Sequence, residues 1–151
     1  MTELKSSADS ATGLTLAPLV SALIDAFIHG LHQRLPAAGF SDIRPAHCTG
    51  VFRVIDPRGT RPTELARRAG VTPQAMAEFV SYLEQRGYLQ RVPDPADGRG
   101  RIVKLTPRGR KAAEAASQAF AEIEAGWTST LGEKRMQQLK AMLAELVGTD
   151  V

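Results

Sequence analysis

Apolar residues recur at intervals of three and four along most of this chain, a spacing that gathers them on one face of an α-helix. The spacing predicts a long helix over residues 15–36 and a shorter helix that begins at Pro45 and is broken by residues 56–59. The same apolar spacing returns after Thr106-Pro107. A cap residue followed by proline marks a helix start, so a helix is expected to begin there. Two further helices, interrupted near Gly132, are expected over residues 107–147.

Residues 61–86 predict two short helices that meet at Gly70, which can end a helix in the left-handed conformation. Thr72 offers a capping oxygen, and Pro73 suits the first position of the second helix. The apolar positions of the pair are Leu65, Ala66, Ala69, Met76, Phe79, Val80 and Leu83. Two helices joined by a tight turn form a helix-turn-helix, whose second helix is suited to the major groove of DNA.

A β-hairpin is predicted directly after this motif. Residues 88–92 and 101–105 have strand character, and the loop between them contains the turn signal Asp97-Gly98. A hairpin in this place is the wing of a winged helix-turn-helix. The expected fold is therefore mainly α with a small β-hairpin wing (α+β). The winged helix-turn-helix would cover about residues 45–105 of a single domain, residues 14–151, after a mobile arm over residues 1–13.

Four segments of this region resemble the multiple-antibiotic-resistance regulators, the MarR family. They are Glu64-Leu65-Ala66, Leu83-Glu84-Gln85-Arg86-Gly87, Asp94-Pro95-Ala96-Asp97-Gly98-Arg99 and Leu105-Thr106-Pro107-Arg108-Gly109. Each segment is weak alone, but their order and spacing together are specific. The resemblance implies a winged-helix transcription factor that forms a two-fold dimer through its N- and C-terminal helices, here residues 15–36 and 107–147. Amphipathic helices left half covered in a monomer favour the same dimer.

Charge is distributed unevenly along the chain. Residues 58–111 contain twelve basic and five acidic residues, which gives this segment a charge of +7. Because the whole chain carries +3, the remainder carries −4. A basic segment in an otherwise acidic protein is typical of a polyanion binder, and together with the wing it favours double-stranded DNA as the partner.

The outward positions of the second helix, the recognition helix, are the expected DNA contacts. They are Thr72, Gln74, Ala75, Ala77, Glu78, Ser81, Tyr82 and Arg86. Glutamine can pair with adenine, serine and tyrosine can donate to phosphates or bases, and alanine can touch a thymine methyl group. Family members often carry arginine where Glu78 and Tyr82 stand here. Glu78 would accept from a cytosine amino group, or else hold Arg67 or Arg86 in place.

The wing supplies three more expected DNA residues: Asp97, Arg99 and Arg101. Arginine is favoured in a narrow minor groove, where the potential is most negative. The resemblance implies that Asp97 holds the guanidinium of Arg99 in position.

The resemblance also implies a pocket for a small aromatic or phenolic anion between the dimer helices and the winged helix. Its expected lining is His47, Cys48, Phe52 and Trp127, with room left by the small residues Cys48 and Gly50. As the single cysteine, Cys48 excludes an internal disulfide, and it is either a small buried thiol or an oxidant sensor. His29 and His32 lack a third ligand nearby, so they do not predict a metal site.

No nucleophile–base pair, phosphate-cradling loop or carboxylate pair stands out, so neither an enzyme nor a cofactor is expected. No apolar run approaches the ~20 residues that cross a membrane, and no signal pattern precedes the first helix. We therefore expect a cytoplasmic protein without a membrane partner. The leading hypothesis is a homodimeric repressor, released from an inverted-repeat operator by a small aromatic or phenolic ligand. The alternatives are an oxidant sensor of the same fold and a winged helix that binds an acidic protein.

Overall fold

A computed structural model describes residues 13–148, so all but the last residue of the predicted arm lies outside the described residues. In chain order the elements are α2 (Leu16–Ala37), α3 (Pro45–His47), the π-helical turn η1 (Cys48–Phe52), α4 (Pro62–Ala69), α5 (Pro73–Gln85), β1 (Leu89–Pro93), β2 (Arg101–Leu105), α6 (Pro107–Leu131) and α7 (Glu133–Val147). The strands form one antiparallel sheet among helices, which confirms the predicted fold class.

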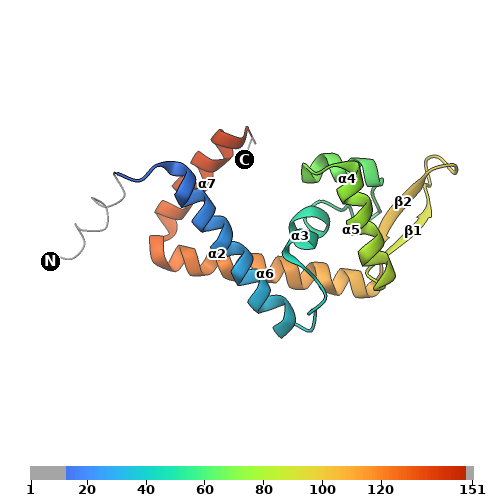
Figure 1. Ribbon diagram of the computed structural model, residues 1–151, viewed down its shortest axis with the longest axis horizontal. Helices are drawn as coiled ribbons and strands as arrows, with labels where there is room; N and C mark the ends of the chain where they lie inside the picture. The colour runs from blue at the N-terminus through green and yellow to red at the C-terminus, as the bar shows by residue number, and fades with distance from the viewer. Residues whose placement is uncertain (1–12, 149–151) are drawn as a thin grey trace.

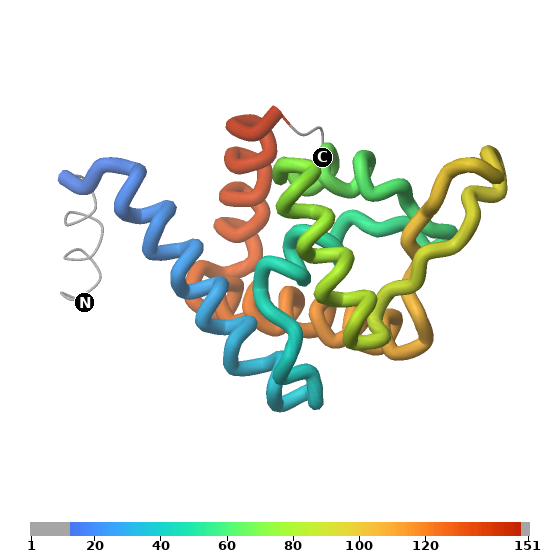
Figure 2. Tube along the Cα trace, turned by 45° about the vertical axis from the view of Figure 1, so that its right-hand side comes forward, coloured from blue at the N-terminus to red at the C-terminus, as the bar shows by residue number. Residues whose placement is uncertain are grey.

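The elements form two groups that α6 joins (Figure 1). At one end α2 and α7 pack against the C-terminal half of α6, and at the other end α4, α5 and the hairpin lie together. Figure 2 shows the N-terminal half of α2 projecting away from the rest of the chain. None of the helices in the described part of the chain is both long and apolar enough to cross a membrane.

The helix-turn-helix closes around side chains that expose none of their surface. They are Leu65, Met76, Val80, Leu83 and Val103, from α4, α5 and β2. Gly70 ends α4 with φ +67°, a left-handed conformation that glycine adopts without steric cost. The Ala75 N–H then donates to the Thr72 hydroxyl at 3.1 Å, which caps α5. The turn therefore forms as the sequence predicts.

The wing is a regular hairpin, in which Leu89 pairs with Leu105 and Pro93 with Arg101. The segment before α4 also joins the sheet, because Thr60 forms an isolated bridge with Val103 through backbone hydrogen bonds of 3.0 and 2.9 Å. This bridge attaches the hairpin to the start of the helix-turn-helix.

The start of α6 lies directly against the end of the recognition helix. The Thr106 N–H donates to the Tyr88 carbonyl at 3.0 Å, and a Cβ at Gly109 would collide with the same carbonyl oxygen. Glycine is therefore needed at position 109 for α6 to approach so closely.

The helix expected from Pro45 toward Ile55 is shorter than predicted. Only residues 45–47 are α-helical, and the chain then widens into η1, where the Arg53 N–H donates to the Cys48 carbonyl at 3.0 Å. Gly50 leaves no free room, because the Phe79 ring packs against it and a Cβ there would lie 3.2 Å from Phe79 Cε2. The expectation that small residues open a cavity here is wrong.

Candidate DNA-binding interface

The outer side of α5 is available to a ligand along its first two turns. Gln74, Ala77 and Glu78 are exposed, while Ala75 and Ser81 are half-buried at its edges. The hydroxyl of Thr72 is occupied by the cap of α5. Among the described residues neither expected partner pairs with Glu78, because Arg67 pairs with Glu64 and Arg86 donates to the Tyr82 carbonyl.

Tyr82 does not point outward as the helical spacing predicts. Its hydroxyl donates to the Asp42 carbonyl at 2.7 Å, and its ring lies between the His47 ring, 4.6 Å away, and the Arg86 guanidinium, 3.4 Å away. A tyrosine at the boundary of a helix face can bury its ring and still satisfy its hydroxyl, which is the arrangement here. The prediction that Tyr82 faces the solvent is therefore wrong.

Arg86 extends from the C-terminal end of α5 and is held over the Tyr82 ring, with Nη1 donating to the Tyr82 carbonyl at 3.3 Å. A guanidinium fixed over an aromatic face loses little further freedom on binding a phosphate.

The wing presents Arg99 and Arg101, both exposed. Within residues 13–148 no carboxylate lies within ion-pair distance of either side chain. Asp97 accepts from the backbone N–H of Arg99 at 3.1 Å, and one of its oxygens lies 3.7 Å from Arg61 Nη2. The expectation that Asp97 holds the Arg99 guanidinium is therefore wrong, because its carboxylate closes the turn instead.

The contact that fixes the wing was not found from the sequence. Arg61 Nε donates to Asp94 Oδ2 at 2.8 Å, and Asp94 Oδ1 accepts from the Ala96 N–H at 2.9 Å. The Ala96 hydrogen bond and then the Arg61 hydrogen bond lower the pKa of Asp94, so it stays charged. The only local sequence signal for this turn is Asp94-Pro95 at the start of the loop, which the sequence-based prediction did not use.

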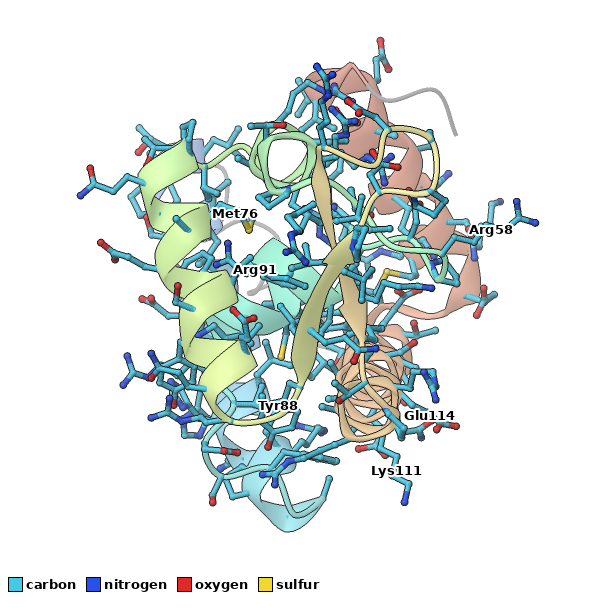
Figure 3. All side chains as sticks on the ribbon, turned by 90° about the vertical axis from the view of Figure 1, so that its right-hand side faces the viewer. Arg58, Met76, Tyr88, Arg91, Lys111 and Glu114 are labelled. Atoms are coloured by element: carbon cyan, nitrogen blue, oxygen red, sulfur yellow. The ribbon has the colours of Figure 1, made fainter. Side chains whose placement is uncertain are left out.

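Salt bridges neutralise part of the basic segment and leave the rest free. Hydrogen bonds from Arg67 and then Arg68 lower the pKa of Glu64 to about 2, so Glu64 stays charged and neutralises part of the positive charge of α4. In the part of the chain that the structure describes, seven cations of residues 58–111 have no carboxylate partner: Arg58, Arg86, Arg99, Arg101, Lys104, Arg110 and Lys111. Figure 3 shows α5 and the hairpin side by side on one face, with Arg91 between them.

The four residues expected to line a ligand pocket do not come together. Trp127 lines a cavity of about 170 Å³ between α2, α6 and α7, whereas Phe52 lines a separate hollow against α6. His47 and Cys48 are buried in the core. The single pocket predicted from the sequence is therefore wrong in its lining, although Trp127 does border a cavity.

Two of these residues have strongly shifted acidities. Burial raises the pKa of the Cys48 thiol to about 12, and none of its surface is exposed. A neutral, shielded thiol reacts slowly with oxidants, so the geometry does not favour an oxidant sensor. Burial, with Arg44 and Arg86 nearby, lowers the pKa of His47 to about 4. Among the described residues no cluster of three or more His, Cys, Asp or Glu side chains is placed to hold a metal ion.

Comparison with known proteins agrees with this geometry. The model of the MarR family matches residues 41–100, which include the helix-turn-helix and most of the wing. The HTH-type transcriptional repressor Rv2887 of Mycobacterium tuberculosis is 36% identical over 92 residues, which cover 61% of this chain and 66% of that relative. Residues 41–100 of this chain form a domain of the MarR family of transcriptional regulators. These relatives are regulators rather than enzymes, as the sequence led us to expect.

Solved structures of this family share the fold over most of the chain. The repressor CouR bound to a 23-mer DNA duplex superposes with a TM-score of 0.76 at 24% identity, covering 91% of this chain and 95% of that one. PcaV from Streptomyces coelicolor, solved with its natural ligand, superposes with a TM-score of 0.71 at 19% identity, covering 90% and 96%. The winged-helix arrangement is thus the one found in the MarR family.

Proposed function

We propose that this MarR-family chain is a homodimeric repressor that binds an inverted repeat in double-stranded DNA. In this proposal α5 lies in the major groove and the wing enters the adjacent minor groove. The main observation in favour of this proposal is the arrangement of charged residues on the wing. Arg99 and Arg101 are exposed, unpaired among the described residues, and attached to a hairpin that the Arg61–Asp94 contact fixes beside α5.

The dimer is supported by a large apolar surface at the other end of the molecule. Its exposed residues are Leu14, Leu16, Leu19, Val20, Leu23, Ile24 and Ile28, with Met142, Leu143, Leu146 and Val147 from α7. Soluble monomers rarely expose so many large apolar side chains in one region. A second copy that covers them would place two recognition helices on one face of the dimer, related by the two-fold axis.

The cavity between α2, α6 and α7 supports regulation by a small aromatic anion. Phe27 stacks on Phe120 with ring centroids 5.5 Å apart, and Trp127 lies 6.3 Å from Phe27. Lys140 lies at the same cavity and is paired with Glu124 at 2.8 Å. An aromatic carboxylate would place its ring among the aromatic side chains and its charge near Lys140. Occupation would then change how α2 and α7 pack on α6, and with them the dimer.

Binding to labelled DNA tests whether the protein recognises a specific DNA sequence. The duplex would carry the region upstream of the protein's own gene, and fluorescence anisotropy would compare it with a shuffled duplex of the same composition. The proposal expects tighter binding to the natural sequence. Equal binding to both would leave the acidic-protein alternative as the better explanation of the basic face.

Intrinsic fluorescence tests whether a small aromatic ligand binds in the cavity, because Trp127 lines the cavity and is the single tryptophan of the chain. A panel of benzoates and phenols should change its emission saturably and should also release the DNA. Lys140→Gln should weaken the response to benzoates more than the response to neutral phenols. If no compound of the panel changes the Trp127 emission saturably, this cavity is not the ligand site.

A further inference from the structure

We propose that Tyr82 and Asp42 are positioning residues, which set the angle of the recognition helix and thereby the half-site separation that the protein accepts in DNA. The inference rests on the proposed function, because half-sites matter only for a dimer on an inverted repeat. It gives Tyr82 a role that differs from the direct DNA contact expected from the sequence.

The first observation is that one residue holds α5 at two points. Asp42 lies in the connector between α2 and α3, and its carbonyl accepts from the Tyr82 hydroxyl at 2.7 Å. Its carboxylate oxygen Oδ1 accepts from the Tyr88 hydroxyl at 2.6 Å. Tyr82 lies in the last turns of α5, and Tyr88 lies just beyond its end. A single hydrogen bond would allow the helix to pivot, but two bonds to one residue oppose that rotation.

The second observation is that α6 joins the same cluster. Arg108 Nη2 donates to the Tyr88 hydroxyl at 3.0 Å and lies 3.6 Å from Asp42 Oδ2. Its guanidinium also lies 4.5 Å from the centre of the Tyr88 ring. Burial, more than any other influence, raises the pKa of Tyr88, so its hydroxyl keeps the proton that it donates to Asp42. The connector after α2, the end of α5 and the start of α6 therefore meet at three side chains.

The geometry of a two-fold dimer makes this cluster important for DNA. The helix α2 carries much of the apolar surface, and α6 runs from that end of the molecule to the winged helix-turn-helix, so both would be fixed relative to the axis when a second copy binds. Any rotation of α5 about the cluster would occur symmetrically in both copies. The separation of the two recognition helices, which selects the half-site spacing, would then vary.

The phenylalanine variant isolates the hydroxyl from the ring. In Tyr82→Phe the ring can keep its stacking with His47 and Arg86, while the hydrogen bond to Asp42 is lost. Tyr88→Phe similarly removes the bond to the Asp42 carboxylate. Arg99→Ala serves as the matched control, because it alters a DNA contact on the wing without touching the cluster.

The experiment measures Kd on a set of operators in which the half-sites are moved apart or together by one base pair at a time. The wild type should discriminate against shifted operators. In Tyr82→Phe the ratio of shifted to optimal Kd should fall by about three- to tenfold, the range for one lost hydrogen bond. The salt dependence should not change. Arg99→Ala should show the opposite pattern, with a reduced salt slope and an unchanged ratio.

A second measurement reads the helix angle in the free dimer. A spin label at Gln85→Cys, exposed at the end of α5, reports the distance between the two recognition helices. Cys48 should escape labelling because it is fully buried. The distance distribution should be narrow in the otherwise wild-type protein and broader with Tyr82→Phe.

An unchanged Kd ratio together with an unchanged distance distribution would overturn the inference. So would an equal loss on every operator with a reduced salt slope, because Tyr82 would then be a DNA contact. A wild type that does not distinguish inverted repeats from shuffled DNA would instead contradict the proposed function itself.

Discussion

Arg61, the residue before α4, contacts Asp94, the first residue of the wing loop, through Nε at 2.8 Å and Nη2 at 2.7 Å. The two residues are thirty-three positions apart, and only 9% of Asp94 is exposed. This ion pair joins the helix-turn-helix to the base of the loop that carries Arg99. The wing is therefore fixed relative to the recognition helix before any DNA binds.

The first prediction concerns this contact. Asp94→Asn should loosen the wing, since it removes the charge that Arg61 faces, and amide exchange over residues 95–100 should become faster. DNA affinity should fall, but by less than in Arg99→Ala, because the arginines remain. Glu84→Gln is the control, because it breaks the exposed Arg91–Glu84 pair without loosening the loop. Equal exchange in both variants would show that the Arg61–Asp94 pair does not order the wing.

Arg99→Ala should weaken DNA binding by roughly 1–3 kcal/mol, the range for a well-placed arginine contact. The loss should be larger on operators with A·T-rich flanks, whose narrow minor groove attracts arginine. Asp97→Ala should give a milder loss of DNA affinity, because Asp97 closes the turn through the Arg99 N–H.

Gln74→Ala, on the recognition helix, should change the preferred half-site sequence and leave the salt dependence of DNA binding nearly intact. Anisotropy on operator variants separates these results, and wild-type affinity in a folded Arg99→Ala would exclude the wing as a DNA element.

Local sequence rules were sufficient for the elements of the fold. Gly70, Thr72 and Pro73 act through their own backbone and its neighbours, so the turn between α4 and α5 could be predicted. The same holds for the hairpin around Asp97-Gly98. The widening at η1 has no local sequence signal; within it, Gly50 packs against the Phe79 ring of another helix.

The side chains of the candidate site were harder to predict, since their partners are distant in sequence. Tyr82 is forty positions from Asp42, and helical spacing places it at the edge of the buried face, where either orientation is allowed. Two aspartates, Asp94 and Asp97, lie three residues apart in the wing. No local rule indicates which of them Arg61 will bind.

The third prediction uses the acidity of His47. Its pKa is about 4 in the folded chain against 6.5 in the unfolded one, so between these values the unfolded state binds more protons. The free energy of unfolding should therefore fall by roughly 2 kcal/mol as the pH drops from 7 to 4.5.

His47→Gln should remove most of this fall. Glutamine can still accept the Arg44 N–H, which donates to His47 Nδ1 at 3.1 Å, but it does not titrate. Urea denaturation of both proteins across this pH range measures the difference. Parallel pH profiles would mean that His47 titrates normally.

The fourth prediction concerns the apolar surface. Leu16→Glu and Leu146→Glu change side chains that are 65% and 73% exposed, so each variant should fold. In a dimer the new carboxylates would be buried without partners, at a cost of several kcal/mol, and monomers should result. Gln137→Lys is the control, because it adds a charge to the other side of α7, where it can pair with Glu133. Sedimentation at micromolar concentration measures the oligomeric state of each variant. A monomeric wild type would contradict the proposed dimer.

The most direct measurement is the affinity of the wild-type protein for its own upstream inverted repeat as a function of salt. Because phosphate contacts release counterions, log K should fall linearly and steeply with log salt, with a slope of about −0.9 for each phosphate neutralised. The account predicts specific binding that weakens in this way, and a shallower slope in Arg99→Ala. Affinity that does not change between low and moderate salt, or that is the same for shuffled DNA, would contradict it.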